Sequence, residues 1–152
     1  MTVTITASAS DPTTRYGKPT FECCGAKIRA HCHHLAMVVT IHGEIDAANV
    51  DRISEYIRQC TLVKNPLVLD LSAVNSFAPV GISFLYILDD ECRTAGVEWT
   101  LVPSPAVIEV LRDYDDETMF PMTRSVHEAL RNLADAIVKR RQLLLPLIKR
   151  TA

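Results

Sequence analysis

The sequence predicts an α/β fold with a mostly parallel mixed sheet of about five strands, an antiparallel edge hairpin and helices packed mainly on one face. Two observations lead to this prediction. Residues 26–45 hold two strand-like runs with a tight connection between them, which is typical of a hairpin. From residue 46 onward, stretches with helical periodicity alternate with short apolar stretches of strand length. Strands that alternate with helices form parallel, right-handed crossovers, so antiparallel pairing is expected only at the hairpin.

Length and composition limit the classes of function. The 152 residues are enough for one domain with one core. The formal net charge of −2 gives no bulk attraction for nucleic acid, and no run approaches the roughly 20 apolar residues that span a membrane. The amino terminus lacks a signal peptide, and five irregularly spaced cysteines suit a reducing compartment. We therefore expect a cytoplasmic protein with no nucleic-acid partner and no membrane span.

Residues 1–25 are expected to form a Ser/Thr-rich tail ahead of a domain that spans residues 26–134. Their composition buries little apolar surface. The alternation from Thr2 to Ala9 leaves a second interpretation open, an added edge strand. The tail hydroxyl groups are also accessible phosphate acceptors, and a phosphate would add about two negative charges beside the domain.

The first elements of the domain are the hairpin and a helix. Residues 26–30 and 37–41 are the expected hairpin strands, the second of them rich in β-branched residues. Asp46 follows the second strand and is a plausible N-cap for a helix over residues 47–60. The apolar residues of that helix recur at three- and four-residue steps, which predicts one stripe facing the sheet.

The stretch from Leu67 to Leu88 combines a buried strand with an apolar helix, and the turn between them is where we expect function to lie. The strand is expected to end near Leu71, and Pro79 suits the first helical position, because its missing N–H costs nothing there. Gly96 is a candidate C-cap. Apolar residues surround nearly the whole helix, which predicts one buried and one exposed, adhesive side. The alternative is that the terminal helix covers the second side.

Shorter elements follow the central helix. A strand is expected over residues 99–102, and Ser104 can cap a helix over residues 106–112. The acidic loop over residues 113–117 is expected to be solvated. A very short strand is expected over residues 119–121.

Ser125 can cap a last helix, which Pro146 should stop near residue 145. Residues 135–152 form a C-terminal helical extension that carries a basic run, Lys139 to Arg141, followed by three leucines. These residues could form a membrane-surface or nucleic-acid patch. Alternatively, the cations complement the end of the helix and the leucines pack on the body or on a second subunit.

Residues of metal-ligating and catalytic types do not form a convincing site. Potential metal ligands gather near the hairpin, namely Cys23, Cys24, His31, Cys32, His33 and His34. Neighbours on a strand point to opposite faces and no paired Cys-x-x-Cys spacing is present, so these are expected to be hairpin residues. Asp89, Asp90 and Glu91 are consecutive on a helix and cannot converge on one substrate. No Gly-rich phosphate loop is present. We expect no enzyme activity, no metal and no cofactor.

Several short motifs resemble the STAS domain, the family that includes bacterial anti-sigma factor antagonists. They are Gly43-Glu44-Ile45-Asp46 before a helix, the run Leu67–Val74 with Gly81 at the following helix start, Val102–Pro105, and Ser125–Leu130. These landmarks stand in the family's order from about residue 26 to residue 133. Each piece is weakly specific, and the set together carries the resemblance.

The resemblance implies a partner-switching regulator rather than an enzyme. Such proteins bind an anti-sigma factor, often a kinase, and so release a sigma factor for transcription in a stress response. The implied contact residues lie at and around the turn between the central strand and helix, and they are Asp46, Asn75, Ser76, Phe77, Ala78, Pro79, Val80, Gly81, Ser83 and Phe84.

The sequence departs from the family pattern at the phosphorylation motif. Phosphorylated members carry Asp-Ser-Ser-Gly at the turn, whereas this chain has Ala78-Pro79-Val80-Gly81. Neither Pro79 nor Val80 has a hydroxyl group, so the usual switch is missing. Ser83 is displaced from the motif position and is at most a substitute.

Control is therefore either absent or located elsewhere. The leading hypothesis is that a Ser/Thr protein kinase acts on the N-terminal tail, at Thr2 or Thr4. An inert leader is the alternative. A second class of function also stays open, a divergent STAS scaffold or ligand sensor that forms a homodimer or has another partner.

Overall fold

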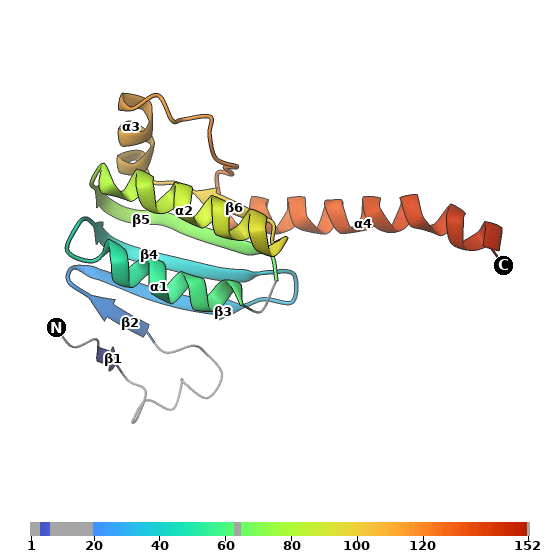
Figure 1. Cartoon of the computed structure of the whole chain (residues 1–152), viewed down its shortest axis with the longest axis horizontal. Coiled ribbons are helices and arrows are strands. Elements are labelled where there is room, and N and C mark those ends of the chain that lie inside the picture. The colour runs from blue at the N-terminus through green and yellow to red at the C-terminus, as the bar shows by residue number, and fades with distance from the viewer. Residues whose placement is uncertain (1–3, 7–19, 63–64, 152) are drawn as a thin grey trace.

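The computed structural model describes residues 4–6, 20–62 and 65–151. The strands are β1 (Thr4–Thr6), β2 (Thr20–Cys23), β3 (Ala26–Cys32), β4 (Met37–Ile45), β5 (Leu67–Phe77) and β6 (Trp99–Val102). The helices are α1 (Val50–Thr61), α2 (Val80–Ala95), α3 (Pro105–Asp113) and α4 (Val126–Thr151). Figure 1 shows α1 and α2 side by side across the sheet, with α4 extending past the ends of the strands.

The strands form one mixed sheet in the order β1-β2-β3-β4-β5-β6. Strands β1 to β4 pair antiparallel, whereas β4, β5 and β6 pair in parallel. The predicted fold class, a mixed sheet with parallel pairing at its centre and an antiparallel edge, is confirmed. The antiparallel part extends further than the single expected hairpin.

Part of the segment predicted as a tail belongs to the sheet. Residues 20–23 form β2 and pair with β3, and residues 4–6 form β1 beside β2. The tail expectation is wrong for these residues, and β1 falls where an edge strand was the second interpretation. A tight turn makes the pairing possible, since Cys24 and Gly25 have positive φ values of 41° and 97°, as in a type I′ hairpin. Cysteine hid this turn from sequence analysis, because Asn or Asp before Gly is the usual signal.

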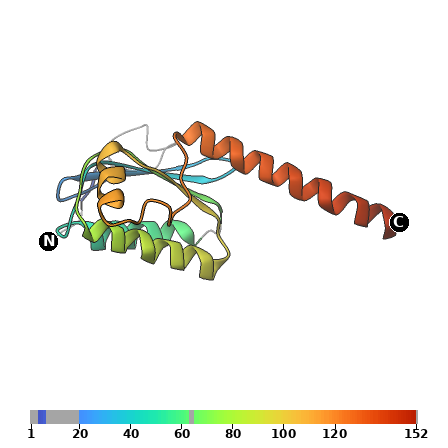
Figure 2. The ribbon, with the colours of Figure 1, turned by 90° about the horizontal axis from the view of Figure 1, so that it is seen from above.

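The core has two parts, one on each face of the sheet. The main core lies under α1, α2 and α3 and includes the fully buried residues Ile41, Leu69 and Leu85. A smaller cluster on the opposite face joins Val38, Val68 and Val102 of the strands to Ala129 of α4. Figure 2 shows α4 on the far side of the sheet from α1 and α2. Helix packing mainly on one face is therefore confirmed, and the terminal helix does not cover α2.

Helix α1 begins at Val50, later than the predicted residue 47, and Asp46 is not its N-cap. The Asp46 Oδ1 atom instead accepts the Ala48 N–H at 2.9 Å, which closes a local turn before the helix. Asn49 occupies the N-cap position, without a capping hydrogen bond from its side chain to the helix. The Asn49 side-chain amide instead forms hydrogen bonds with other segments of the chain.

Asn49 is completely buried, with an exposed fraction of 0%, and its amide connects three segments. The Nδ2 atom donates to the carbonyl oxygens of Glu44 at 2.8 Å and Cys24 at 3.1 Å. The Cys23 carbonyl is also within reach at 3.4 Å. The Oδ1 atom accepts the Asp46 N–H at 3.0 Å. The end of β4, the start of α1 and the β2–β3 turn are thereby held together.

Strand β5 is longer than predicted and does not turn at once after Leu71. It continues to Phe77, with a register irregularity where it passes β4 between Thr40 and His42. At this irregularity, the Asp70 Oδ1 atom accepts hydrogen bonds from the Ser72 N–H at 3.0 Å and the Ser72 hydroxyl at 2.6 Å. The bulge breaks the two-residue alternation of buried and exposed side chains, and this concealed the second half of the strand.

The predicted caps of three helices are confirmed. Gly96 ends α2 in the left-handed conformation, with φ at 73°. The Ser104 Oγ atom accepts the Val107 N–H at 3.3 Å at the start of α3. The Ser125 Oγ atom accepts the Glu128 N–H at 3.1 Å at the start of α4. These local signals act within four residues and need no tertiary partner.

Two expectations for the last third of the chain are wrong. Residues 119–121 form no strand. The next residue, Met122, makes only an isolated parallel bridge to Leu101. Helix α4 continues through Pro146 to Thr151. A helix-interior proline removes one main-chain hydrogen bond at a cost of about 3 kcal/mol, and the bonds on either side can carry the helix past it. Within the described residues, none of the helices combines the length and the apolar character that crossing a bilayer requires.

Replacement of Asn49 by alanine tests the buried amide contact. Asn49→Ala leaves the Cys24 and Glu44 carbonyls without their buried donor, and we expect it to lower the free energy of unfolding by about 2–4 kcal/mol. Urea denaturation followed by circular dichroism measures this loss. Asn132→Ala, at an exposed position of α4, is the matched control. Equal urea midpoints for the two variants would contradict the structural role of Asn49.

Candidate functional site

The junction between β5 and α2 lies at the end of the sheet, beside the end of β4. Ile45 is the register partner of Phe77, and the Ala78 N–H donates to the Ile45 carbonyl at 2.8 Å. Only Ala78 and Pro79 link the strand to the helix, and Pro79 is the N-cap of α2, so the helix begins one residue later than predicted. Asp46 follows Ile45 directly, so it lies next to the residue that bonds the junction.

Gly81 is required by the packing of the first turn of α2. A Cβ atom at Gly81 would lie 2.4 and 2.5 Å from atoms of the Phe77 ring. Phe77 is 5% exposed and belongs to the main core, so its ring has no space to move aside. The helix therefore starts directly on the Phe77 ring, which fixes the direction in which α2 leaves the sheet.

Helix α2 has one buried side and one exposed side, as predicted. Its buried residues are Gly81, Ile82, Phe84, Leu85, Leu88 and Cys92. Ser83, Tyr86 and Ile87 are exposed, and the exposed fraction is 39% for Tyr86 and 48% for Ile87. An apolar side chain of this size in water favours burial against a partner.

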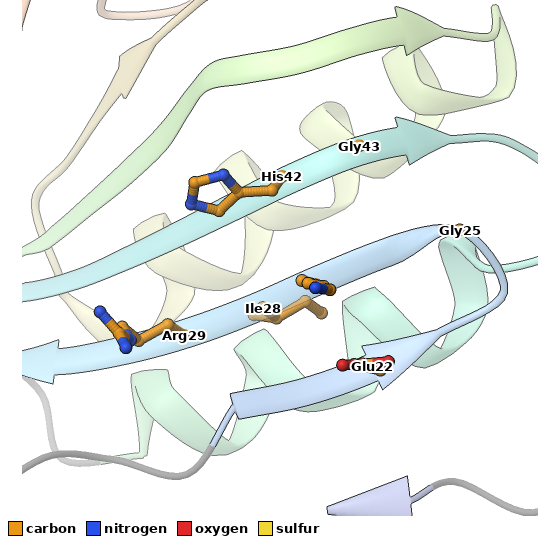
Figure 3. A pocket seen from close by; sticks show the side chains of 7 residues that line it. Glu22, Gly25, Ile28, Arg29, His42 and Gly43 are labelled. Carbon is orange, nitrogen blue, oxygen red and sulfur yellow. The ribbon is translucent and has the colours of Figure 1, made fainter. Parts of the chain in front are cut away.

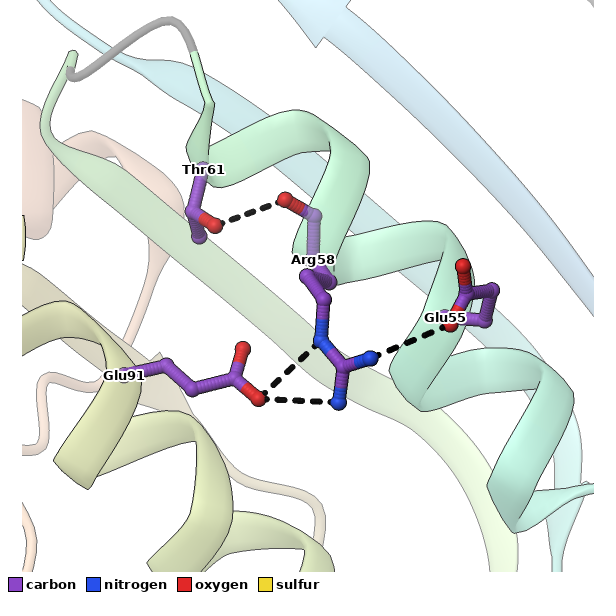
Figure 4. A network of polar contacts seen from close by, with 4 residues as sticks. All are labelled: Glu55, Arg58, Thr61 and Glu91. Atoms are coloured by element: carbon purple, nitrogen blue, oxygen red, sulfur yellow. Dashed lines mark hydrogen bonds and ion pairs between the residues drawn. The ribbon is translucent and has the colours of Figure 1, made fainter.

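Helix α1 borders α2 on one side. Arg58 of α1 donates to one carboxylate oxygen of Glu91 on α2, from Nε at 3.2 Å and from Nη2 at 3.0 Å (Figure 4). A further Arg58 nitrogen, Nη1, pairs with Glu55 at 3.3 Å. The pairs are exposed and contribute little to stability. A narrow crevice beside them is lined by Ser54, Ile57, Phe84, Ile87, Leu88 and Glu91.

The acidic loop borders α2 on the other side. The Tyr86 hydroxyl donates to the Asp116 Oδ1 atom at 2.6 Å, and this hydrogen bond raises the pKa of Tyr86. The Tyr86 ring also packs edge-on against Phe120, with centroids 4.9 Å apart. The loop is thus attached to α2 through Asp116, whereas sequence analysis predicted only a solvated segment.

The structure brings the predicted contact residues into one region but does not expose all of them. Asn75, Ser76, Pro79 and Ser83 are exposed, and Asp46, Ala78 and Val80 are half-buried. Phe77, Gly81 and Phe84 are buried. This corrects the expectation for these three residues, because their side chains shape the surface from below and do not form part of it.

The exposure of several residues that border this surface could not be predicted from the sequence. Tyr86 and Ile87 belong to the apolar helix, but whether they are exposed depends on which side of α2 faces the sheet. Arg58 and Glu91 lie 33 residues apart, and no spacing rule connects them. At the junction itself, Pro79 is exposed, and Ser76 and Ser83 are the flanking exposed hydroxyls.

The Cys and His residues near the hairpin do not converge. In the described part of the chain, no three residues of ligand type lie together as a potential metal centre. Cys23 is buried under the sheet, whereas Cys32 is exposed at the end of β3. The deeply buried thiol is Cys92, whose pKa is raised to about 11 mainly by burial and further by Asp89 and Glu91. A thiol with so high a pKa is a poor nucleophile.

The mixed sheet, the α1–α2 layer and the strand–helix junction define a small α/β domain with an exposed surface beside its central helix. The STAS domain family model matches residues 27–129. Osmosensory protein A of Mycobacterium tuberculosis (strain ATCC 25618 / H37Rv) is 58% identical over 158 residues, and the match covers the whole of both chains. The chain therefore belongs to the STAS domain family.

Solved structures share this fold at low sequence identity. An anti-sigma factor antagonist from Mycobacterium paratuberculosis is 23% identical, with a TM-score of 0.65 over 72% of this chain and 94% of its own. The anti-sigma factor antagonist SpoIIAA in its unphosphorylated form is 15% identical, with a TM-score of 0.59 over 71% and 96% of the two chains. These similarities establish the architecture of the sheet and helices.

The contact between Gly81 and Phe77 yields a stability prediction. Gly81→Ala should lower the free energy of unfolding by about 1–3 kcal/mol, because the new methyl group overlaps the Phe77 ring. Thermal unfolding measures the change, and Ser83→Ala on the exposed side of α2 is the control. The double variant Gly81→Ala/Phe77→Leu should lose less than the sum of the two single losses. Strict additivity would show that the two residues do not contact each other as described.

Proposed function

We propose that this protein is an anti-sigma factor antagonist-like regulator, which binds an anti-sigma factor and so frees a sigma factor for transcription. Membership of the STAS family supports this, as do the anti-sigma factor antagonists among the proteins of the same fold. The observation that carries the proposal is an exposed surface next to the β5–α2 junction. This α2 surface consists of Pro79, Ser83, Tyr86 and Ile87.

The α2 surface has the composition of a protein contact. Ile87 and Tyr86 supply an apolar centre, and the ion-paired Arg58 and Glu91 supply a polar margin on one side. Protein interfaces commonly place apolar and aromatic side chains inside a polar rim. We take the partner to be an anti-sigma factor of the kinase type, because this is the partner that the family resemblance implies.

Partner binding requires a form of control that differs from the family's usual one. Neither Pro79 nor Val80 can carry a phosphate, so the junction lacks the family's usual phosphorylation switch. Under this proposal, a Ser/Thr protein kinase modifies Thr2 or Thr4 in the N-terminal segment, or the partner is bound without such control. Thr4 begins strand β1, and Thr2 lies outside the described residues.

The name of the 58% identical relative points to the setting of this regulation. A protein called Osmosensory protein A suggests a response to osmotic stress. We include that stress response in the proposed function, with the protein acting in the cytoplasm, where sigma factors meet RNA polymerase.

Substitutions on the α2 surface test the proposed contact. Ile87→Glu and Ser83→Asp each add a charge that a bound partner would desolvate, and we expect each to weaken binding to a host anti-sigma factor by about tenfold or more. Isothermal titration calorimetry against the panel of host anti-sigma factors measures this. Phe84 is unsuitable for the test, because it is 2% exposed and a charge there would unfold the domain.

Val138→Glu on α4 is the matched control for these variants. Val138 is 51% exposed and lies on a helix that packs on the opposite face of the sheet. The Val138→Glu variant should bind the anti-sigma factor with the same affinity as the unmodified protein. If no host anti-sigma factor binds the unmodified protein, the proposed function fails.

Mass spectrometry tests the proposed location of control. Protein purified from its own host after osmotic stress should carry one phosphate on Thr2 or Thr4, and Thr2→Ala/Thr4→Ala should abolish it. The modification should change affinity for the anti-sigma factor. An N-terminal segment without phosphate under stress would show that control is absent from it.

A second candidate function is a STAS scaffold that forms a homodimer. The observation favouring it is α4, which extends beyond the body of the domain and exposes Val138 (Figure 2). Long helices draw most of their stability from tertiary packing, so a second copy would stabilise this one. Sedimentation equilibrium distinguishes the cases: a monomer at micromolar concentration excludes the homodimer, and a dimer that binds no anti-sigma factor favours the scaffold.

A further inference from the structure

The face of the sheet opposite α1 and α2 is only partly covered. Helix α4 packs on it around Val38, Val68 and Val102. Further along β3 and β4 the same face carries Lys27, Arg29 and His42, all three exposed. A hollow of about 690 Å³ lies there, and its lining is Glu22, Gly25, Lys27, Ile28, Arg29, His42 and Gly43. We call this the open-face hollow.

The sheet register brings the basic groups of the hollow close together. Lys27 pairs directly with His42, and directly opposed residues of antiparallel strands have Cβ atoms about 5 Å apart. Arg29 is two residues along β3, about 7 Å away and on the same face. Figure 3 shows Arg29 and His42 on neighbouring strands, with the helices behind the sheet. A group the size of a phosphate can reach all three side chains at once.

The two cations of the hollow make no ion pair. Among the described residues, no ion pair within 4 Å involves Lys27 or Arg29, although Glu22 is the register partner of Lys27. The residues that line the hollow carry a formal charge of +1 with His42 counted as neutral, and the Glu44 carboxylate stands beside Gly25 at one end. The His42 imidazole has one N–H to donate.

The end wall of the hollow is rigid, because two glycines allow the β2–β3 turn to approach β4. A Cβ atom at Gly43 would lie 2.2 Å from the Gly25 carbonyl oxygen. The Glu44 N–H donates to that same oxygen at 3.1 Å. Asn49 holds the turn from the opposite side through the Cys24 carbonyl. The basic side chains therefore project from a backbone that does not need to be ordered when a ligand arrives.

We propose that the open-face hollow is a binding site for a phosphoryl group, held by Lys27, Arg29 and His42. A phosphate monoester carries between one and two negative charges at neutral pH and three strong acceptor oxygens, which match two cations and one N–H donor. A long polyanion is disfavoured, because the basic patch is small and the chain has a net charge of −2.

The register also identifies a source within the chain. Thr4 pairs with Glu22, Glu22 with Lys27 and Lys27 with His42, so the backbone of residue 4 lies in the same row of the sheet as the hollow. One strand, β2, separates residue 4 from β3 and Lys27, so a phosphothreonine at residue 4 is a candidate source of the phosphoryl group. The other source is a free phosphate monoester such as a nucleotide. Only the first source rests on the proposed kinase control of the N-terminal segment.

Nuclear magnetic resonance of the ¹⁵N-labelled full chain tests the site. Titration with inorganic phosphate at constant ionic strength should give saturable amide shifts at residues 22–29 and 40–43. Lys27→Gln/Arg29→Gln should weaken this binding by about tenfold or more. The control Arg124→Gln/Lys139→Gln, which removes two exposed cations elsewhere, should change it less than about twofold. His42→Gln is a second, single-site variant that should also weaken it.

Two further samples distinguish the source of the phosphoryl group. If the full chain with phosphothreonine incorporated at residue 4 already shows the shifts and no longer titrates with free phosphate, the source is the N-terminal segment. If it still titrates, and adenosine monophosphate binds more tightly than inorganic phosphate, the source is a free monoester. Shifts that chloride reproduces, or that the Lys27→Gln/Arg29→Gln variant retains in full, would overturn the proposal.

The outcome is separable from that of the proposed function. The hollow and the α2 surface lie on opposite sides of the sheet, so Lys27→Gln/Arg29→Gln should leave the affinity of the unphosphorylated protein for an anti-sigma factor unchanged. Ile87→Glu should likewise leave phosphate binding unchanged.

Discussion

The buried amide of Asn49 is the contact on which both surfaces of this domain depend. Its hydrogen bonds join the β2–β3 turn, the end of β4 and the segment that leads into α1. Leaving such carbonyls unpaired in the core would cost several times the net value of an ordinary hydrogen bond, so the three segments stay together. On one face this positions Ile45, which holds the β5–α2 junction through Ala78. On the other face of the sheet, the Asn49 amide fixes the turn that forms the end wall of the open-face hollow.

The β5–α2 junction combines an exposed surface with residues that cannot carry a phosphate. Gly81 lets α2 start directly on the Phe77 ring, and Ser83 and Ile87 face outward. Pro79 and Val80 have no hydroxyl group. Under the proposed function, control of partner binding lies elsewhere, and strand β1 at the edge of the sheet connects the N-terminal segment to the body of the domain.

The fold class was predictable because its determinants are periodic. The apolar run that begins at Leu67, the stripe along α1 and the strand–helix alternation were predicted and are present in the structure. Strand β2 was not predicted, because its turn has Cys24 at a position of positive φ and its composition is that of a tail. The extent of β5 was also missed, because a bulge breaks the two-residue alternation after Leu71. Within the candidate site, the region was predicted, but the burial of Phe77, Gly81 and Phe84 was not.

The family resemblance, the order of the parallel elements and the caps at Gly96, Ser104 and Ser125 were all readable from the chain alone, as was the absence of a hydroxyl group at Pro79 and Val80. They depend on residues close together in the chain, or on the identity of a single residue. The folded chain was needed to show which side of α2 is exposed, which distant groups meet Asn49, and how Lys27, Arg29 and His42 line one hollow. These features follow from strand register and helix rotation, and burial across the whole core sets both.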